Sequence, residues 1–224
     1  KQLVYHEQEN GKRIQWHTLS VPRGGEYKLV LADGTRVWLN AASELMYPDH
    51  FSADQRKVVL KGEAYFEVTK DVKRPFSVVL GDMEVKVLGT SFNVSAYPGV
   101  KRQTTLIEGQ VAVNWHRQQV VIRPGQQAAE TDEGLRVASV NVMNYVGWKE
   151  HRFVYENKLL GEVLEDLERW YDVEVFVMHD EIRNLHLTAN LPRYENMDKV
   201  LEIIEYAACV KFEVKGRTVV VRRD

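Results

Sequence analysis

Acidic and imidazole side chains gather at one point in the first quarter of the chain. Asp49, His50 and Asp54 follow one another closely within the irregular connection at residues 41–57. Their oxygen and nitrogen atoms are ligands that zinc and calcium accept. A metal site needs several converging ligands, and no further ligand pairs surround these three. The sequence therefore favours a polar connection here over a metal site.

Two glutamates raise the question of glycoside hydrolysis, in which a pair of acids flanks the scissile bond. Glu63 and Glu108 each stand in a short Gly-Glu or Glu-Gly turn ahead of alternating apolar residues. Nothing in the sequence brings the two carboxylates together beside a substrate groove. We therefore expect both of them at turns or strand ends.

The sequence lacks the usual motifs of nucleophilic catalysis and of phosphate binding. The chain contains no phosphate-cradling Gly-x-x-x-x-Gly-Lys loop, no nucleophile elbow, no His-Glu-x-x-His and no Cys-x-x-Cys. Cys209 is the only cysteine, so no disulfide framework or thiolate metal site is expected. Its apolar neighbours at the end of a predicted helix indicate a buried, unreactive thiol. The sequence thus predicts no catalytic residue, no cofactor and no metal.

The composition is that of a soluble globular chain. The 224 residues are 44% hydrophobic and 28% charged, which suits one large or two ordinary domains with a real core. A formal net charge of -2 gives no excess of basic residues of the kind that binds nucleic acid. No apolar run approaches the roughly 20 residues of a membrane-spanning helix, and no signal peptide opens the chain. Because the chain starts at Lys1 without Met, we interpret it as an excised fragment.

The elements that would position any site begin with three strand-like runs in residues 61–94. Apolar and polar residues alternate in each run with the two-residue period of a half-buried strand. The inward members are predicted to be Ala64, Phe66, Val68, Phe76, Val78, Leu80, Met83, Val85 and Val87. Pro75 cannot donate to a ladder, so it fits the start of the second run. Gly81-Asp82 between two apolar runs predicts a tight hairpin.

The same alternation continues over residues 26–149. About ten short strands are predicted between residues 26 and 140, at a spacing typical of an antiparallel sandwich or roll. Asp33-Gly34 supplies the turn of the first hairpin, and Trp38 points to the face opposite its neighbours. Residues 1–25 are predicted to be a polar leader that precedes this all-β domain.

Near residue 150 the pattern changes to alternating strands and amphipathic helices. The clearest helix is predicted to start at Asn157 as N-cap and to end at Tyr171, with Leu164 and Leu167 on its apolar face. A second helix is predicted after an N-cap at Asn196. Residues 150–224 therefore predict a small α+β domain, built as βαβ followed by βαββ in two similar halves.

Several short motifs follow one another through the first domain in a fixed order. They are Asp33-Gly34-Thr35, Val37-Trp38-Leu39-Asn40, Gly62-Glu63-Ala64-Tyr65-Phe66-Glu67-Val68, Pro75-Phe76, Val87-Leu88-Gly89-Thr90-Ser91-Phe92-Asn93-Val94, Leu106-Ile107-Glu108-Gly109-Gln110-Val111 and Pro124-Gly125-Gln126. Each is ordinary by itself, but together they resemble the core signature of the FecR family of anti-sigma regulators. Trp170-Tyr171-Asp172-Val173 resembles the C-terminal domain that follows FecR cores in Bacteroidetes regulators. That domain is in turn similar to the short secretin and TonB N-terminal fold.

The resemblance implies a non-enzymatic regulator in the periplasm. Such proteins are anchored to the inner membrane by a single span, and a short cytoplasmic segment binds an extracytoplasmic-function sigma factor. Both the span and that segment would be absent from this chain. The implied periplasmic partner is the N-terminal domain of an outer-membrane TonB-dependent receptor, with no nucleic acid and no cofactor. The alternative is a secreted or periplasmic carbohydrate-binding β-domain that uses Trp38, Trp115 or Trp148 as stacking platforms.

Partner binding is expected on the α+β domain. A small sheet leaves edges on which another chain can add a strand. The strands predicted at residues 185–191 and 218–222 are both candidates, and the sequence does not rank them. The expected partner-binding residues are His186, Thr188, Asn190, Thr218, Val220 and Arg222.

Overall fold

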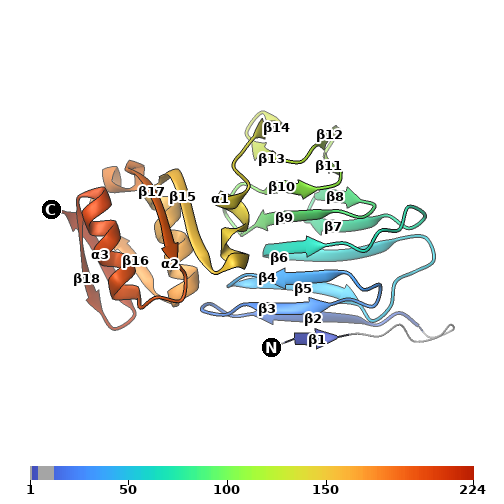
Figure 1. Ribbon diagram of the computed structural model, residues 1–224, viewed down its shortest axis with the longest axis horizontal. Helices are drawn as coiled ribbons and strands as arrows, with labels where there is room; N and C mark the ends of the chain where they lie inside the picture. Colours follow the sequence, from blue (N-terminus) through green and yellow to red (C-terminus); the bar gives the residue numbers. More distant parts are fainter. Residues whose placement is uncertain (1, 5–12) are drawn as a thin grey trace. The chain divides into compact units, whose positions relative to one another are not determined.

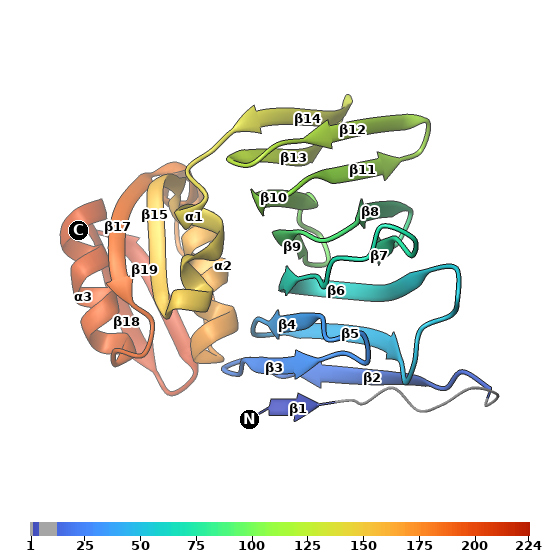
Figure 2. The same ribbon diagram turned by 45° about the vertical axis from the view of Figure 1, so that its right-hand side comes forward.

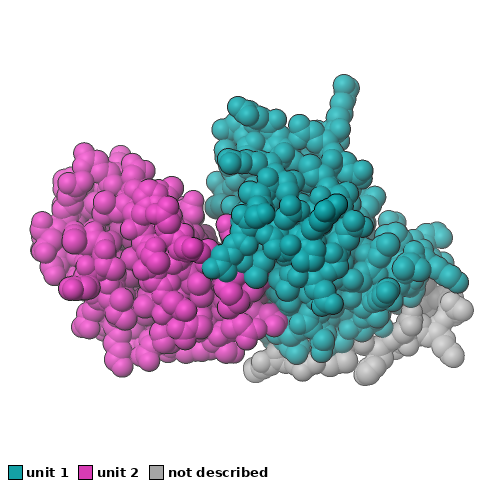
Figure 3. All heavy atoms as spheres, turned by 45° about the horizontal axis from the view of Figure 1, so that its top comes forward, with its two compact units in different colours: residues 1–22, 26–142 teal, residues 23–25, 143–224 magenta. Residues whose placement is uncertain are grey.

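The computed structural model describes residues 2–4 and 13–224. Among these, the residues up to Pro22 together with Glu26–Val142 form one compact unit, called unit 1. Arg23–Gly25 and Met143–Asp224 form the second, called unit 2 (Figure 3). The long segment of unit 2 begins at Met143, ahead of the predicted change at residue 150.

Unit 1 is built from strands that stack from β1 at one end to β14 at the other (Figures 1 and 2). Their bounds are β1 (Gln2–Val4), β2 (Trp16–Val21), β3 (Tyr27–Val30), β4 (Arg36–Leu39), β5 (Ser43–Pro48), β6 (Arg56–Glu67), β7 (Phe76–Leu80), β8 (Met83–Val87), β9 (Ser91–Ala96), β10 (Gln103–Glu108), β11 (Val111–Trp115), β12 (Gln118–Ile122), β13 (Gln126–Thr131) and β14 (Gly134–Ser139).

The 12-residue strand β6 joins two layers. Its first half pairs with β5 and, in parallel, with β7. Its second half pairs antiparallel with β4 and β9. One layer therefore runs β1-β3-β4-β6-β9-β10-β13-β14 and the other β2-β5-β6-β7-β8-β11-β12. Most pairs are antiparallel, so the predicted fold class, a mainly β part followed by a small α+β part, is confirmed.

The core of unit 1 follows the two-residue period of the sequence. All nine apolar side chains predicted to face inward between residues 64 and 87 are buried. Pro75 directly precedes β7, and Gly81-Asp82 forms the turn of the β7–β8 hairpin, where Leu80 pairs with Met83. The alternation of a strand is therefore enough to predict which residues form this core.

The predicted leader is only partly a leader. Trp16–Val21 form β2, which pairs antiparallel with β5, and Gln2–Val4 form β1, which is parallel to β3. Residues 1 and 5–12 lie outside the described residues. Only Leu19 and Val21 of β2 contact the core. Because so few residues of β2 are apolar and inward, the sequence pattern was too weak to predict this strand.

The Asp-Gly-Thr motif between β3 and β4 holds a buried ion pair. Arg56, at the start of β6, is fully buried and its Nη1 lies 2.8 Å from Asp33 Oδ2. The Asp33 carboxylate also accepts hydrogen bonds from the Thr35 amide at 3.0 Å and the Thr35 hydroxyl at 2.7 Å. The guanidinium donates to the carbonyls of Thr69 and Arg74. This network satisfies a charge that would otherwise be costly to bury.

Unit 2 contains two helices of three turns, two short sheets and several single turns (Figure 1). Its elements are α1 (Met143–Val146), η1 (Gly147–Glu150), β15 (Arg152–Leu159), α2 (Leu160–Tyr171), β16 (Glu174–Val177), η2 (Asp180–Asn184), β17 (His186–Pro192), α3 (Met197–Ala208), β18 (Val210–Lys215) and β19 (Thr218–Arg223).

The two sheets of unit 2 share the helices as a common core. Antiparallel β15 and β17 form one sheet, and β16-β19-β18 form the other. Helix α2 contacts β15, β16 and β17, and α3 contacts β17 and β18, so each helix packs on both sheets. The buried apolar positions of the helices are Leu160, Val163, Leu164, Leu167, Trp170, Val200, Leu201 and Ile204. The order of elements matches the predicted βαβ and βαββ halves.

One of the two predicted helix caps is correct. The Asn196 side chain accepts a hydrogen bond from the Asp198 amide at 3.0 Å, as expected of the N-cap of α3. Asn157 is not a cap, because α2 starts after Leu159. Asn157 instead lies in an irregularity of β15 between Tyr155 and Lys158, with a φ of 52°. Asparagine tolerates this left-handed conformation better than most residues, which explains its place in a bulge.

Cys209 was predicted to be buried and is exposed. It is the C-cap of α3, in the left-handed conformation with a φ of 53°. The chain changes direction there, and the next residue, Val210, enters the core in its place.

Candidate partner-binding site

Of the acidic residues that suggested a metal site, Asp49 fixes the backbone directly after β5. Asp49 Oδ1 accepts hydrogen bonds from the amides of Gln15, at 3.1 Å, and His50, at 2.8 Å. Burial by itself would raise the pKa of Asp49, but these hydrogen bonds and the neighbouring His50 lower it. Asp54 is exposed. Within the described ranges, no three His, Cys, Asp or Glu side chains converge as metal ligands would.

The glutamates that suggested hydrolysis are also structural. Glu63 Oε2 accepts from Asn40 Nδ2 at 2.6 Å, and Glu63 Oε1 accepts from Asn93 Nδ2 at 2.9 Å. Through these two amides, one carboxylate of β6 links the end of β4 to β9. Glu108 is exposed at the end of β10, where the pairing with β9 shifts register.

The tryptophans proposed as sugar platforms are each in contact with neighbouring side chains or buried. Lys28 Nζ lies 4.4 Å from the centre of the Trp38 ring, and Tyr65 meets that ring edge-on at 5.7 Å. Arg102 lies over Trp115 at 5.4 Å. Trp148 is buried. A sugar-binding platform needs an exposed aromatic face, so this geometry does not favour the carbohydrate-binding alternative.

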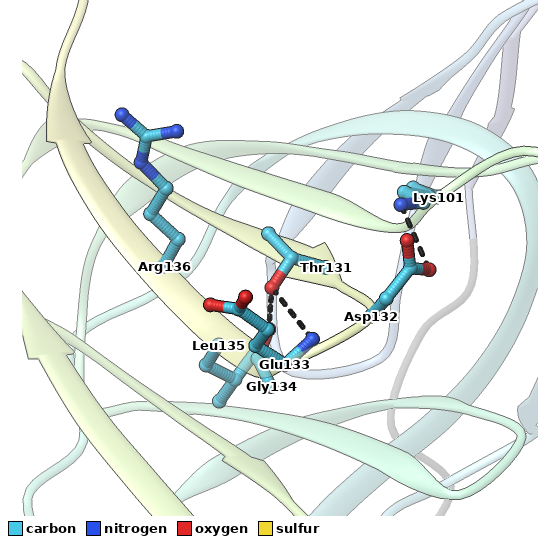
Figure 4. Close-up of a pocket in the computed structure, with 7 residues that line it drawn as sticks. All are labelled: Lys101, Thr131, Asp132, Glu133, Gly134, Leu135 and Arg136. Carbon is cyan, nitrogen blue, oxygen red and sulfur yellow. Dashed lines mark hydrogen bonds and ion pairs between the residues drawn. The ribbon is translucent and has the colours of Figure 1, made fainter.

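One shallow depression lies at the β13–β14 turn (Figure 4). It is lined by Lys101, Thr131, Asp132, Glu133, Gly134, Leu135 and Arg136. Several of its polar groups bond one another: Thr131 Oγ1 donates to the Gly134 carbonyl at 2.8 Å, and Lys101 pairs with Asp132 at 3.0 Å. These contacts define the turn and leave no convergent set of groups for a ligand.

The structure ranks the two strands that were expected to bind a partner. Strand β19, which carries Thr218, Val220 and Arg222, is the centre of its sheet and pairs with β16 on one side and β18 on the other. A strand paired on both sides cannot accept a third, so the expectation that β19 offers an edge is wrong. Strand β17 pairs only with β15 among the described strands. Of the two candidate strands, β17 is therefore the one with an open edge.

The outward side chains of β17 are those that the sequence predicted. His186, Thr188 and Asn190 are exposed, while Leu187 and Leu191 are buried against the helices. This alternation leaves a polar outer face. Strand β15, the other member of the sheet, packs against α1 and η1, so β17 lies on the side away from those two turns.

The direction of the β17 backbone groups can be followed from its first pair. Just before β17, the Leu160 amide donates to the Leu185 carbonyl at 2.7 Å, while the Leu185 amide turns back to the Ile182 carbonyl at 3.2 Å. The next pair, Leu159 with His186, is then a non-bonded pair of the antiparallel ladder. The His186 amide consequently points to the open edge, where an added strand would accept its hydrogen bond.

Two polar contacts on β17 were missed by sequence reasoning. The Asn157 amide, in the bulge of β15, donates to Thr188 Oγ1 at 2.9 Å. Arg152 donates to the Asn190 side chain and, at 3.1 Å, to the Asn190 carbonyl. Both contacts join residues more than 30 positions apart, and no local pattern reveals them. Thr188 and Asn190 therefore hold β15 in place as well as facing outward.

A partly buried charge cluster fixes the sheet to helix α2. Asp166 accepts from Lys158 Nζ at 2.7 Å and from Arg169 Nη2 at 2.7 Å. Burial by itself would raise the pKa of Asp166, but the positive charges of Lys158 and Arg169 lower it below its ordinary value. Burial also raises the pKa of Tyr155 well above its ordinary value. The cluster thus stays charged at neutral pH and anchors the end of β15 that pairs with His186.

Comparisons with known proteins identify both units. Residues 17–112 match the family described as FecR protein, and residues 152–221 match the family described as FecR, C-terminal. Two crystal structures of a protein from Parabacteroides distasonis ATCC 8503, provisionally described as an anti-sigma factor, share 26% identity with this chain at a TM-score of 0.87. The alignments cover 93% and 94% of this chain, and 99% and 100% of those chains. The curated proteins contain no match.

Proposed function

Because this chain belongs to the FecR family of anti-sigma factors, we propose that it is the periplasmic sensor region of a membrane-anchored member of that family. In this proposal it reports the state of an outer-membrane TonB-dependent receptor to a cytoplasmic sigma factor. Its action is protein contact, and no chemical step is assigned to it. None of the helices in the described ranges is long and apolar enough to cross a membrane.

Unit 2 is the part that docks the receptor, through the open edge of β17. The observation that carries this proposal is the free strand itself, with an outward amide at His186 and a polar outer face. Main-chain pairing supplies affinity in such complexes and side chains of alternate residues supply specificity. The receptor's periplasmic N-terminal domain would add one of its strands beside β17. The sigma factor would be bound by a cytoplasmic segment that these residues do not include.

A proline at position 186 tests the docking edge without breaking the ladder. His186→Pro removes an outward amide and keeps the pairing with β15, whose neighbouring bond uses Leu185 and Leu160. Leu185 already has a φ of -64° and a ψ of 150°, which is the conformation that a residue before proline adopts. His186→Ala keeps the amide and serves as the matched control.

The assay is calorimetric titration of the periplasmic N-terminal domain of a TonB-dependent receptor from the same genome into the whole 224-residue chain. We expect His186→Pro to weaken binding by about 10-fold or more, because a strand partner is left with an unpaired acceptor, and His186→Ala to stay within about 2-fold. Each variant must show the thermal transition of the wild type. Equal binding by wild type and His186→Pro would remove β17 as the docking edge, and no binding by any receptor domain of that genome would reject the receptor as partner.

A further inference from the structure

The two outer strands of the three-stranded sheet have edges that differ from that of β17. At the two ends of β16, the Glu174 amide donates to the Arg217 carbonyl just before β19, at 2.8 Å, and the Met178 amide donates to the Val221 carbonyl of β19, at 2.9 Å. The amide of Val175 lies between them in the alternation of a strand, so it points away from β19 to the open side. It does not face water: Glu168 Oε1, from helix α2, accepts its hydrogen bond at 2.7 Å.

The opposite edge of the same sheet has the same arrangement. Strand β18 pairs with β19 through a hairpin in which Lys215 faces Thr218. Alternate amides of β18 therefore point outward. The Phe212 amide is bonded by Glu205 Oε1, from helix α3, at 2.7 Å. Lys211 lies 3.6 Å from the other oxygen of Glu205 and holds the carboxylate at the edge.

These two contacts are one structural device built twice. In each, the acceptor glutamate lies seven residues before the amide. A left-handed C-cap lies between them, Asp172 in one half and Cys209 in the other, and its amide returns to the carbonyl of the same glutamate. The two halves of unit 2 thus repeat the carboxylate together with the turn that aims it.

Without their carboxylates, both edges could pair with a strand of another chain. Phe176 on β16 is 56% exposed and Val214 on β18 is 39% exposed. An edge strand with free amides and exposed apolar side chains is a template for pairing with another chain. An edge amide already bonded to a carboxylate cannot donate to an added strand, whose carbonyl would also meet that negative charge.

Strand β17 lacks such a carboxylate. In the described part of the chain, no side chain accepts a hydrogen bond from a β17 backbone amide, and the polar contacts of Thr188 and Asn190 run toward β15. Unit 1 has a neutral counterpart of the device at its terminal strand β14, where Gln118 Oε1 accepts from the Leu135 amide at 2.7 Å. The open edge of β17 is thus an exception among these strands.

We propose that Glu168 and Glu205 close both edges of the three-stranded sheet against strand addition, and so determine that a partner strand docks on β17. The claim that both edges are closed depends only on the two glutamate hydrogen bonds described above. The part that concerns β17 rests on the proposed function. The two parts are therefore tested by separate measurements.

Amide hydrogen exchange of the whole chain tests the edge closure without any partner. We expect the Val175 amide to exchange slowly in the wild type and about 10- to 100-fold faster in Glu168→Ala, which is the range for losing a hydrogen bond to a charged group. Glu168→Asp, whose carboxylate is too short to reach, should behave like alanine. Glu168→Gln keeps an acceptor oxygen and should stay within a few-fold of the wild type.

The same series at Glu205 reports on the Phe212 amide. Because the two positions are independent, misfolding of one variant leaves the other to be measured. Exchange at Val175 and Phe212 that is unchanged in both alanine variants would overturn the proposal.

Sedimentation of the full-length variants tests the consequence for association. We expect the double variant Glu168→Ala/Glu205→Ala to form dimers or larger species through its unprotected edges, while the double glutamine variant remains at the mass of the wild type. Receptor titration into the alanine variant should give more than one receptor domain per chain. A double alanine variant that keeps the wild-type mass and stoichiometry would show that the carboxylates do not select the docking edge. Absence of receptor binding to the wild type would instead reject the proposed function and leave the exchange result intact.

Discussion

Asp33→Ala is the sharpest test of how unit 1 is held together. Arg56 is fully buried, and its single carboxylate partner in the described structure is Asp33, at 2.8 Å. The carbonyls of Thr69 and Arg74 would still accept hydrogen bonds from the guanidinium after the substitution. They carry no net charge, so a buried cation would be left without a counter-ion.

The size of the expected loss in stability depends on whether one or both partners of the buried ion pair are removed. Removing one partner of a buried ion pair costs about 3–5 kcal/mol, whereas replacing both partners by apolar groups of similar volume is often close to neutral. The Thr35 amide and hydroxyl lose their shared acceptor as well. We expect Asp33→Ala to lower the free energy of unfolding of unit 1 by at least about 3 kcal/mol. Asp33→Asn keeps an acceptor oxygen and should cost less.

Urea denaturation of the whole chain measures this change by tryptophan fluorescence, to which unit 1 contributes Trp16, Trp38 and Trp115. The variants are Asp33→Ala, Asp33→Asn, Arg56→Met and the double variant Asp33→Ala/Arg56→Met. The double-mutant cycle isolates the coupling between the two charges from their other contacts. We expect the double variant to be more stable than Asp33→Ala alone. A cost for Asp33→Ala within about 1 kcal/mol, or an additive cycle, would refute the counter-ion reasoning.

Three further predictions concern the helices, the unit boundary and pH. Leu167→Ala should destabilise unit 2 by about 2–5 kcal/mol because Leu167 is buried in the core. Its control, Glu165→Ala, should change the stability by no more than about 0.5 kcal/mol. Equal losses in thermal denaturation would contradict the orientation of α2. Residues 143–224 expressed alone should melt cooperatively with mixed α/β circular dichroism, and a coil-like spectrum would show that they need the rest of the chain. The hydrogen bonds of Arg102 lower the pKa of both Asp82 and Glu130 in the folded state, so their stabilisation is present above the unfolded carboxyl pKa of about 4 and is lost as pH falls through the folded values. Arg102→Leu should therefore reduce the fall in melting temperature between about pH 6 and about pH 3, and an unchanged fall would exclude this cluster as its source.

Local patterns predicted the elements that depend on local physics. The alternation over residues 61–94 identified the buried side chains of three strands, because a strand places every second residue on one face. Asn196 was recognised as a cap because its hydrogen bond reaches only two residues along the chain. Asn157 has equally good cap chemistry, and what displaces it is a bulge set by pairing with β17.

The candidate site depended on pairing that no local pattern contains. Strands β17 and β19 have similar alternation, yet one lies at an edge and the other at a centre. The difference arises because β16 pairs in parallel with β19, more than 40 residues further along the chain. Glu168 and Glu205 likewise looked like ordinary solvent-facing residues of amphipathic helices. Only the direction of the neighbouring backbone amides gives them a role.

The shared strand β6 has a consequence for how unit 1 reaches its native state. Each half of β6 is the central partner of a different layer, so neither layer can be completed before β6 is in place. Pairs such as Tyr65 with Asn93 close loops of nearly 30 residues, and topologies with such distant pairing fold in milliseconds to seconds. Until β9 has paired with it, the second half of β6 exposes its backbone to other chains. The yield of folded protein should therefore fall with chain concentration during refolding, at a step that the stability of the finished domain does not govern.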